Sequence, residues 1–172
     1  MNEIVNILKS KIKPKEKVTR LADEIKRDIK FIKEIINYFE TAKAGDQGHL
    51  IESLEYTSKE YPELIIPHLE FIIQHLDNDA PRVKWECARI IVNLAPRYCE
   101  KLIKSIPNIL RNTEDKGTVV RWSSAFALGE IAKYSSKNPK ELISKMKHLM
   151  ENEKNNGVKN VYLKALKALE KG

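Results

Sequence analysis

Residues 83–94 read VKWECARIIVNL, and this stretch decides the fold because its pattern returns as VRWSSAFALGEI at 120–131 and as VKNVYLKALKAL at 158–169. Each copy begins with Val and a basic residue, and its mostly apolar positions +4, +5, +8 and +11 share one side of a 3.6-residue helix. The copies begin 37 and 38 residues apart. A period of 20–50 residues is typical of helical repeat arrays. The pattern therefore predicts an all-α chain of stacked repeats.

A second helix is expected before each copy. The predicted ranges are 62–76, then 100–111 with a bend at Pro107, then a helix from an Asn138 cap to about residue 150. The repeated helices are expected to end at Pro96 and before Ser135, and Thr118 is expected to cap the middle one. Together these signals predict three helical hairpins.

The first part of the chain carries a weaker version of the pattern, in which Asp46 takes the Val position. A partner helix is expected over residues 29–39, with Ile29 on its apolar face, and a short helix over residues 4–13. Terminal units of a repeat array are usually atypical because one face must be solvated. We therefore expect one domain over residues 1–172, with a cap and first helix in 1–43 and repeats near 29–60, 61–97, 98–136 and 137–172.

The hairpins resemble HEAT repeats. The resemblance is carried by residues 64–69 with their Pro, by the acidic turn leading to Val83-Lys84, and by residues 105–110 followed by Asp115 and Val120-Arg121. It covers residues 60–170 well and 20–59 weakly. It implies a right-handed α-α superhelix of about four hairpins plus an N-terminal helical cap, with the second helices lining a concave face. It also implies a structural ladder between repeats, for which the candidates are Asp79 (or Asp77), Lys84, Asp115, Arg121 and Lys159.

Charge is unevenly distributed along the 172 residues, whose net charge is +7. Residues 1–43, 44–79, 80–118 and 119–172 carry +4, −7, +4 and +6. Charge blocks of this kind bias partner choice more than fold. With no long apolar run and no signal-type leader, we expect a cytoplasmic protein without membrane contact, in which Cys87 and Cys99 are reduced thiols.

One stripe of the repeated helices is the candidate binding site. Offsets +2, +6, +9 and +13 flank the buried side of each helix. The stripe is aromatic in the middle and basic toward the C-terminus, and its candidate partner-binding residues are Trp85, Arg89, Trp122, Phe126, Lys133, Lys164 and Lys167. Two simpler interpretations stay open: the Trp residues pack in the core, and the Lys run is a solvated helix face.

The sequence contains no recognisable catalytic set, phosphate loop or metal-ligand spacing, so we expect neither an enzyme nor a cofactor or metal. The leading hypothesis is a non-catalytic scaffold that binds a protein partner along the concave face. The alternative is a nucleic-acid-binding protein, either without catalysis or similar to HEAT-like DNA glycosylases, with Glu86 and Glu130 nearest the groove aromatics. A subunit of a larger assembly is a third hypothesis that rests on fold analogy.

Overall fold

The computed structural model describes residues 2–136 and 139–171, and every regular element within those ranges is a helix. The elements, in chain order, are α1 (Asn2–Lys9), α2 (Pro14–Arg27), α3 (Phe31–Phe39), α4 (Ala44–Glu60), α5 (Pro62–Ile65), η1 (Ile66–His68), α6 (Leu69–His75), α7 (Pro81–Leu102), η2 (Ile103–Ser105), α8 (Ile106–Asn112), α9 (Thr118–Tyr134), α10 (Lys140–Asn152) and α11 (Asn156–Glu170). None of these helices is both long enough and apolar enough to span a membrane. The all-α prediction is therefore confirmed for the part of the chain that is described.

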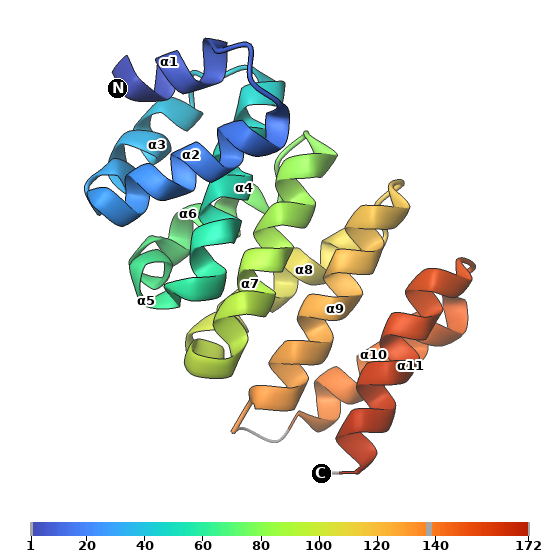
Figure 1. Cartoon of the computed structure of the whole chain (residues 1–172). Coiled ribbons are helices and arrows are strands. Elements are labelled where there is room, and N and C mark those ends of the chain that lie inside the picture. Colours follow the sequence, from blue (N-terminus) through green and yellow to red (C-terminus); the bar gives the residue numbers. More distant parts are fainter. Residues whose placement is uncertain (1, 137–138, 172) are drawn as a thin grey trace.

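Four helices lie side by side in one row, in the order α4, α7, α9 and α11 (Figure 1). The shorter helices α6, α8 and α10 lie behind them, and α1, α2 and α3 cover the α4 end. The two ends of the chain therefore lie at opposite ends of the row. Each helix of the row packs on the next one, so apolar residues from neighbouring helices share one core.

The repeated segments form α7, α9 and α11, and their Val residues Val83, Val120 and Val158 are all buried. Pro81 occupies the first turn of α7, where its missing N–H leaves no helical bond unmade. Asn155 caps α11, because its side-chain oxygen accepts a hydrogen bond from the Val158 N–H at 3.1 Å. The starts of α7 and α11 are thus encoded locally.

Two of the predicted shorter helices are interrupted by 3₁₀ turns at or near a proline. The single helix predicted over residues 62–76 is divided into α5, η1 and α6, and the 3₁₀ turn η1 contains Pro67. The bend expected at Pro107 is another 3₁₀ turn, η2, just before α8. A proline cannot donate the i→i−4 hydrogen bond, so the chain tightens at these points.

The helix that contains Pro96 breaks at Tyr98, two residues after its predicted end, where φ is −131° and ψ is 22°, and the chain is helical again up to Leu102. Three other predicted helix boundaries were wrong. Thr118 is the first residue of α9 and does not cap it; Gly117 is the N-cap residue. Ile29 lies before α3 in a turn closed by the Asp28 side chain, and it is 56% exposed. The first helix ends at Lys9 instead of 13, and the predicted Asn138 cap lies outside the described residues.

Both cysteines are buried as free thiols. Cys87 lies in the core of α7, and the Cys99 thiol donates to the Ile131 carbonyl at 3.3 Å. Burial raises the pKa of both thiols, well above its ordinary value for Cys87. The two side chains therefore serve as small apolar groups in the packing of α7.

Gly129 sets the closest approach of α9 to α11. A Cβ at this position would lie 2.8 Å from the Ala165 Cβ, which is shorter than any normal carbon–carbon contact. The absence of a side chain therefore lets the two helix backbones pack together here.

We predict that Gly129→Ala lowers the free energy of unfolding by about 1–2 kcal/mol, because the new methyl group overpacks the α9–α11 contact. The matched control is Gly45→Ala, at which a Cβ meets nothing within 4 Å. The control is expected to be neutral or slightly stabilising because alanine favours the helix. Urea denaturation measures both; equal stabilities for the two variants would contradict the packing argument.

Stability should also fall in mild acid because His75 is buried between Phe39 and Phe71. Desolvation lowers the pKa of His75, an effect that Glu40 at 3.3 Å only partly offsets, and burial lowers the pKa of His49 and His68 as well. Unfolded histidine titrates near ~6.5. The unfolded chain therefore binds more protons below that pH, and the free energy of unfolding decreases as pH falls from ~6.5 through the lowered folded-state pKa values.

We predict that His75→Gln reduces the stability lost between about pH 7.5 and 5.5, measured by urea denaturation at each pH. His148→Gln is the control, since this residue is exposed. An unchanged pH dependence in His75→Gln would show that the buried ring does not cause the effect.

Candidate functional site

The acidic and basic blocks of the sequence face each other across the α4–α7 boundary and the turns behind it. Five ion pairs between described residues join an acid of 44–79 to a base of 80–118. They are Arg82–Glu52, Arg89–Glu55 at 3.1 Å, Arg97–Glu63 at 3.5 Å, Lys104–Glu70 and Arg111–Asp77 at 2.6 Å. Much of the charge asymmetry is therefore neutralised within the fold.

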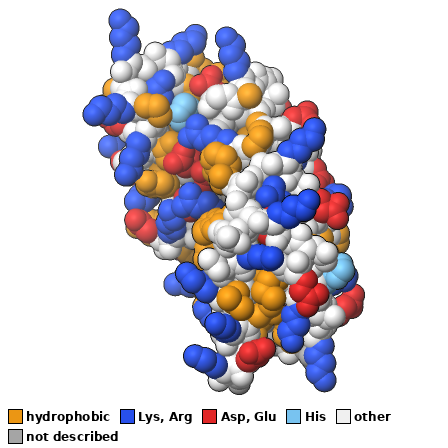
Figure 2. Space-filling view, turned by 90° about the vertical axis from the view of Figure 1, so that its right-hand side faces the viewer, with side chains coloured by type: hydrophobic (Ala, Val, Ile, Leu, Met, Phe, Trp, Pro, Cys, Tyr) orange, Lys and Arg blue, Asp and Glu red, His pale blue; other side chains and the backbone are white. Residues whose placement is uncertain are grey.

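The side of the molecule in Figure 2 agrees with this pairing. Basic side chains occur over most of that surface, acidic side chains are scattered among them, and apolar side chains form separate patches between them. This face therefore presents no uninterrupted basic stripe of the kind that would follow a phosphate backbone.

Two partly buried ion pairs join successive helices of the row through their turns. Lys84 Nζ lies 2.8 Å from Asp115 Oδ2, and Arg121 Nε lies 2.9 Å from Glu153 Oε2. Arg121 also donates to the Asp115 carbonyl at 2.9 Å. Burial by itself would raise the pKa of Asp115, but hydrogen bonds from Lys84 and the Gly117 N–H hold it below its ordinary value. The pKa of Glu153 is lowered in the same way. Burial by itself would raise it, but the hydrogen bond and the charge of Arg121 outweigh burial.

Only some of the predicted ladder residues form contacts between neighbouring helices. Lys84, Asp115 and Arg121 take part in these contacts, whereas Asp79 and Lys159 form no ion pair with any described residue. Asp77, the alternative to Asp79, pairs with Arg111 on the surface. Glu153 was not anticipated, because the last repeat has an acid five residues before its Val where the middle repeat has Asp115.

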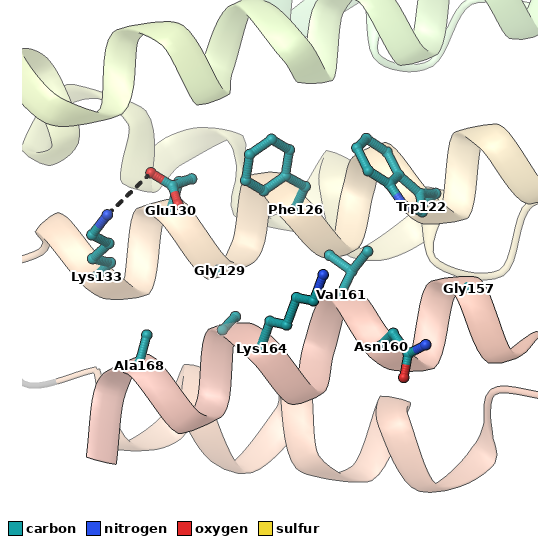
Figure 3. Close-up of a pocket in the computed structure, with 11 residues that line it drawn as sticks. Trp122, Phe126, Gly129, Glu130, Lys133, Gly157, Asn160, Val161, Lys164 and Ala168 are labelled. Carbon is teal, nitrogen blue, oxygen red and sulfur yellow. Dashed lines mark ion pairs between the residues drawn. The ribbon is translucent and has the colours of Figure 1, made fainter. Parts of the chain in front are cut away.

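A hollow of about 480 Å³ lies between α9 and α11. We call it the α9–α11 hollow; it is lined by Trp122, Phe126, Gly129, Glu130, Lys133, Gly157, Asn160, Val161, Lys164, Ala165 and Ala168. Figure 3 shows the Lys164 side chain reaching from α11 toward α9, and Lys133 beside Glu130 at the far end of the hollow, with an N–O distance of 4.0 Å. The lining is mainly apolar, and its charged groups stand at the edge.

A second hollow of about 540 Å³ lies between α7 and α9 and extends to α4. We call it the α7–α9 hollow; it is lined by Glu55, Lys59, Trp85, Glu86, Arg89, Val92, Asn93, Val119, Trp122, Ser123 and Phe126. Trp122 and Phe126 border both hollows, and their ring centroids are 5.6 Å apart. The two hollows therefore lie on either side of this aromatic pair, and we refer to them together as the groove across α7, α9 and α11.

Two buried carboxylates distinguish the α7–α9 hollow. Glu55 is 1% exposed and Glu86 is 3% exposed. Arg89 lies 3.1 Å from Glu55 and 3.5 Å from Glu86, and the Trp85 Nε1–H donates to Glu86 at 2.8 Å. Burial raises the pKa of Glu86, although the Trp85 hydrogen bond and the Arg89 charge partly offset the rise. Arg89 is therefore occupied in neutralising two acids that water no longer solvates.

The structure brings most of the predicted binding residues to this groove. Trp122, Phe126, Lys133 and Lys164 line the α9–α11 hollow, and Trp85 and Arg89 line the α7–α9 hollow. Lys167 is exposed on α11 but lines neither. Trp122 is 40% exposed, so it does not pack in the core, whereas Trp85 is half-buried.

Sequence reasoning misplaced or missed several groove residues. Glu55 belongs to the acidic block 44–79, and its charge alone would place it on the surface; it is buried because α7 covers this side of α4. Glu86, Asn93, Val161 and Ala165 were not proposed as partner-contacting residues. For Glu55 the available signal was its i+4 spacing from the core residue Ile51, which puts both on one helix face.

The residues of the groove suit the binding of an apolar ligand. Among the described residues, no group of three or more His, Cys, Asp or Glu side chains is arranged to hold a metal ion. The groove instead offers an exposed indole, a neighbouring phenyl ring and charged groups at its edge. Such surfaces bind apolar side chains and orient them through peripheral polar contacts.

We predict that Arg121→Met lowers the free energy of unfolding by about 1–3 kcal/mol, because it leaves the nearly buried Glu153 carboxylate without its partner. Lys104→Met is the matched control; it removes a base from the exposed Lys104–Glu70 pair. Exposed pairs contribute little, so the control should unfold almost like the wild type. Equal losses, measured by urea denaturation, would refute a special role for the partly buried pair.

Comparison with known proteins adds no family to this description. Neither protein-family models nor curated protein sequences give a match to this chain. The functional conclusion therefore depends on the fold and the groove.

Proposed function

We propose that this chain is a HEAT-like α-solenoid of about four hairpins with an N-terminal helical cap, and that it works as a non-catalytic scaffold binding a protein partner. The observation that carries the proposal is the groove across α7, α9 and α11, with Trp122 40% exposed between its two hollows. An aromatic side chain held in this way, with apolar surface on both sides, is typical of protein interfaces.

The spacing of contacts along the chain supports the repeat architecture. Four of the five ion pairs between 44–79 and 80–118 join residues 34 positions apart, and so does Lys26–Glu60. A constant separation is expected when each structural unit contacts only its neighbours. It agrees with the 37- and 38-residue spacing of the repeated helices.

Charge favours a protein partner over a nucleic acid strand. Arg82, Lys84, Arg89 and Arg121 are all held by carboxylates of the fold. Nucleic-acid affinity comes mainly from bases that are available to neutralise phosphates. In addition, Glu55 and Glu86 line one end of the groove. The basic residues counted in the sequence therefore overstate the charge available to a ligand.

One observation favours nucleic acid as a second candidate. Lys164 and Lys167 are exposed on α11, form no ion pair with described residues, and lie on the helix that faces Trp122 across the hollow. Aromatic stacking beside free lysines is a known arrangement for single strands.

We predict that Trp122→Ala abolishes capture of the protein partner in affinity purification from the source cell. The substitution removes the exposed indole ring that borders both hollows. Ile29→Ala is the control, since Ile29 is an exposed apolar residue outside both hollows. Trp85→Ala is the second variant; it also removes a hydrogen bond to Glu86, so its folding must be checked. A partner that Trp122→Ala and Trp85→Ala both retain, while folded, would overturn the groove assignment.

Fluorescence anisotropy with labelled single- and double-stranded DNA separates the two candidates. We expect weak binding at low salt and none at physiological salt, because three of the four basic residues that line the two hollows, Lys59, Arg89 and Lys133, are paired with acids. Tight binding that falls steeply with salt and is lost in a Lys164→Glu, Lys167→Glu variant would instead establish the nucleic-acid function.

A further inference from the structure

We propose that the α9–α11 hollow receives one bulky apolar side chain of a partner segment that has Asp or Glu next to that side chain. The inference rests on the proposed scaffold function and specifies which partner chemistry the groove selects. It depends on two independent features of the hollow, the size of the residues that line it and the charge at its edge.

Small residues line the α9–α11 hollow, although Ala165 already occupies the space beside Gly129. In the register of the repeat, Ala168 stands where the preceding repeat has the larger Glu130. Gly157 and Ala165 also line the hollow. The result is a space of about 480 Å³ beside the Trp122 and Phe126 rings. Filling an apolar space with an apolar side chain removes both surfaces from water, and this supplies most of the affinity.

Charge at the edge of this hollow is positive. Lys164 lines it without an ion pair among the described residues, and Lys167 follows three residues later on the exposed surface of α11. Lys133 is only loosely paired, at 4.0 Å, with Glu130, the one acid among the lining residues. The hollow therefore attracts an acidic residue and repels a basic one. Such contacts at an exposed edge contribute selectivity more than affinity.

The charged groups at the opposite end of the groove, near α4, are already paired. This difference in charge orients the bound segment along the groove. There Glu55 and Glu86 are neutralised by Arg89, and Lys59 lies 3.1 Å from Glu55. That end offers no free cation to an acidic residue. An acidic segment is consequently placed over α11 and not over α4.

The test is selection of random 12-residue peptides displayed on phage against the full chain, followed by titration of labelled synthetic peptides. We expect enriched peptides to share a large apolar residue flanked by Asp or Glu. Replacing the acids with Lys in the best peptide should raise its Kd at least tenfold, and replacing the apolar residue with Ala should remove measurable binding.

Two variants of the protein assign the site. Ala168→Leu fills the hollow from an exposed position, so the fold is expected to remain intact and the Kd to rise at least tenfold. Lys164→Glu should raise the Kd for the acidic peptide several-fold, whereas Lys147→Glu, the same change at an exposed residue of α10 outside the hollow, should leave it unchanged. Thermal unfolding of each variant verifies the fold.

The results that would contradict this inference differ from those that would contradict the proposed function. Enriched peptides that lack acids, or that bind Ala168→Leu equally well, would overturn this inference and leave the scaffold function standing. No enrichment over the Ala168→Leu variant would also overturn it, and so would self-association that Ala168→Leu abolishes, since a second copy would then occupy the hollow. The proposed binding of a protein partner in the groove fails only if the folded Trp122→Ala and Trp85→Ala variants both retain that partner.

Discussion

No helix in the row of α4, α7, α9 and α11 can bury its apolar side alone, so each depends on the helix before it and the helix after it. Val83, Val120 and Val158 are buried at equivalent places because each successive helix repeats the same contact. The packing between neighbouring helices is so close at Gly129 that α11 leaves no room for a side chain there. Where each helix packs mainly on its neighbours, stability is approximately a sum of nearest-neighbour contacts, and the outermost helices need a different cover. The covering of α4 by α1, α2 and α3 is consistent with that requirement.

Electrostatics follows the same nearest-neighbour rule. The acidic segment 44–79 and the basic segment 80–118 have opposite charge and lie in contact, so their side chains pair across the boundary instead of creating a field for distant partners. The partly buried pairs Lys84–Asp115 and Arg121–Glu153 repeat this arrangement in the next two turns. Because removing one member leaves a charge with little access to water, these pairs favour one register between neighbouring helices of the row.

The groove arises where this packing is relaxed. Trp122 and Phe126 stand on the exposed side of α9, and the small residues of α9 and α11 leave space beside them. In the α7–α9 hollow the corresponding space is crossed by Arg89, which neutralises Glu55 and Glu86. Two neighbouring positions of one repeat pattern therefore differ in chemistry. The α9–α11 hollow is apolar and has one lysine, Lys164, without an ion pair to a described residue, whereas the α7–α9 hollow is polar and its charges are paired.

The sequence by itself determined the helical class and the positions of α7, α9 and α11, because a periodic apolar face and local capping signals act within one segment. It also identified the stripe that contains Trp122, Phe126 and Lys164, since helical spacing alone puts these residues beside the buried face. It did not determine the burial of Glu55, the pairing of Arg121 with Glu153, or the exposure of Trp122. Those properties depend on which side chains a neighbouring helix brings into contact and on how closely that helix approaches. Only the tertiary structure decides them, because they belong to pairs of segments more than thirty residues apart.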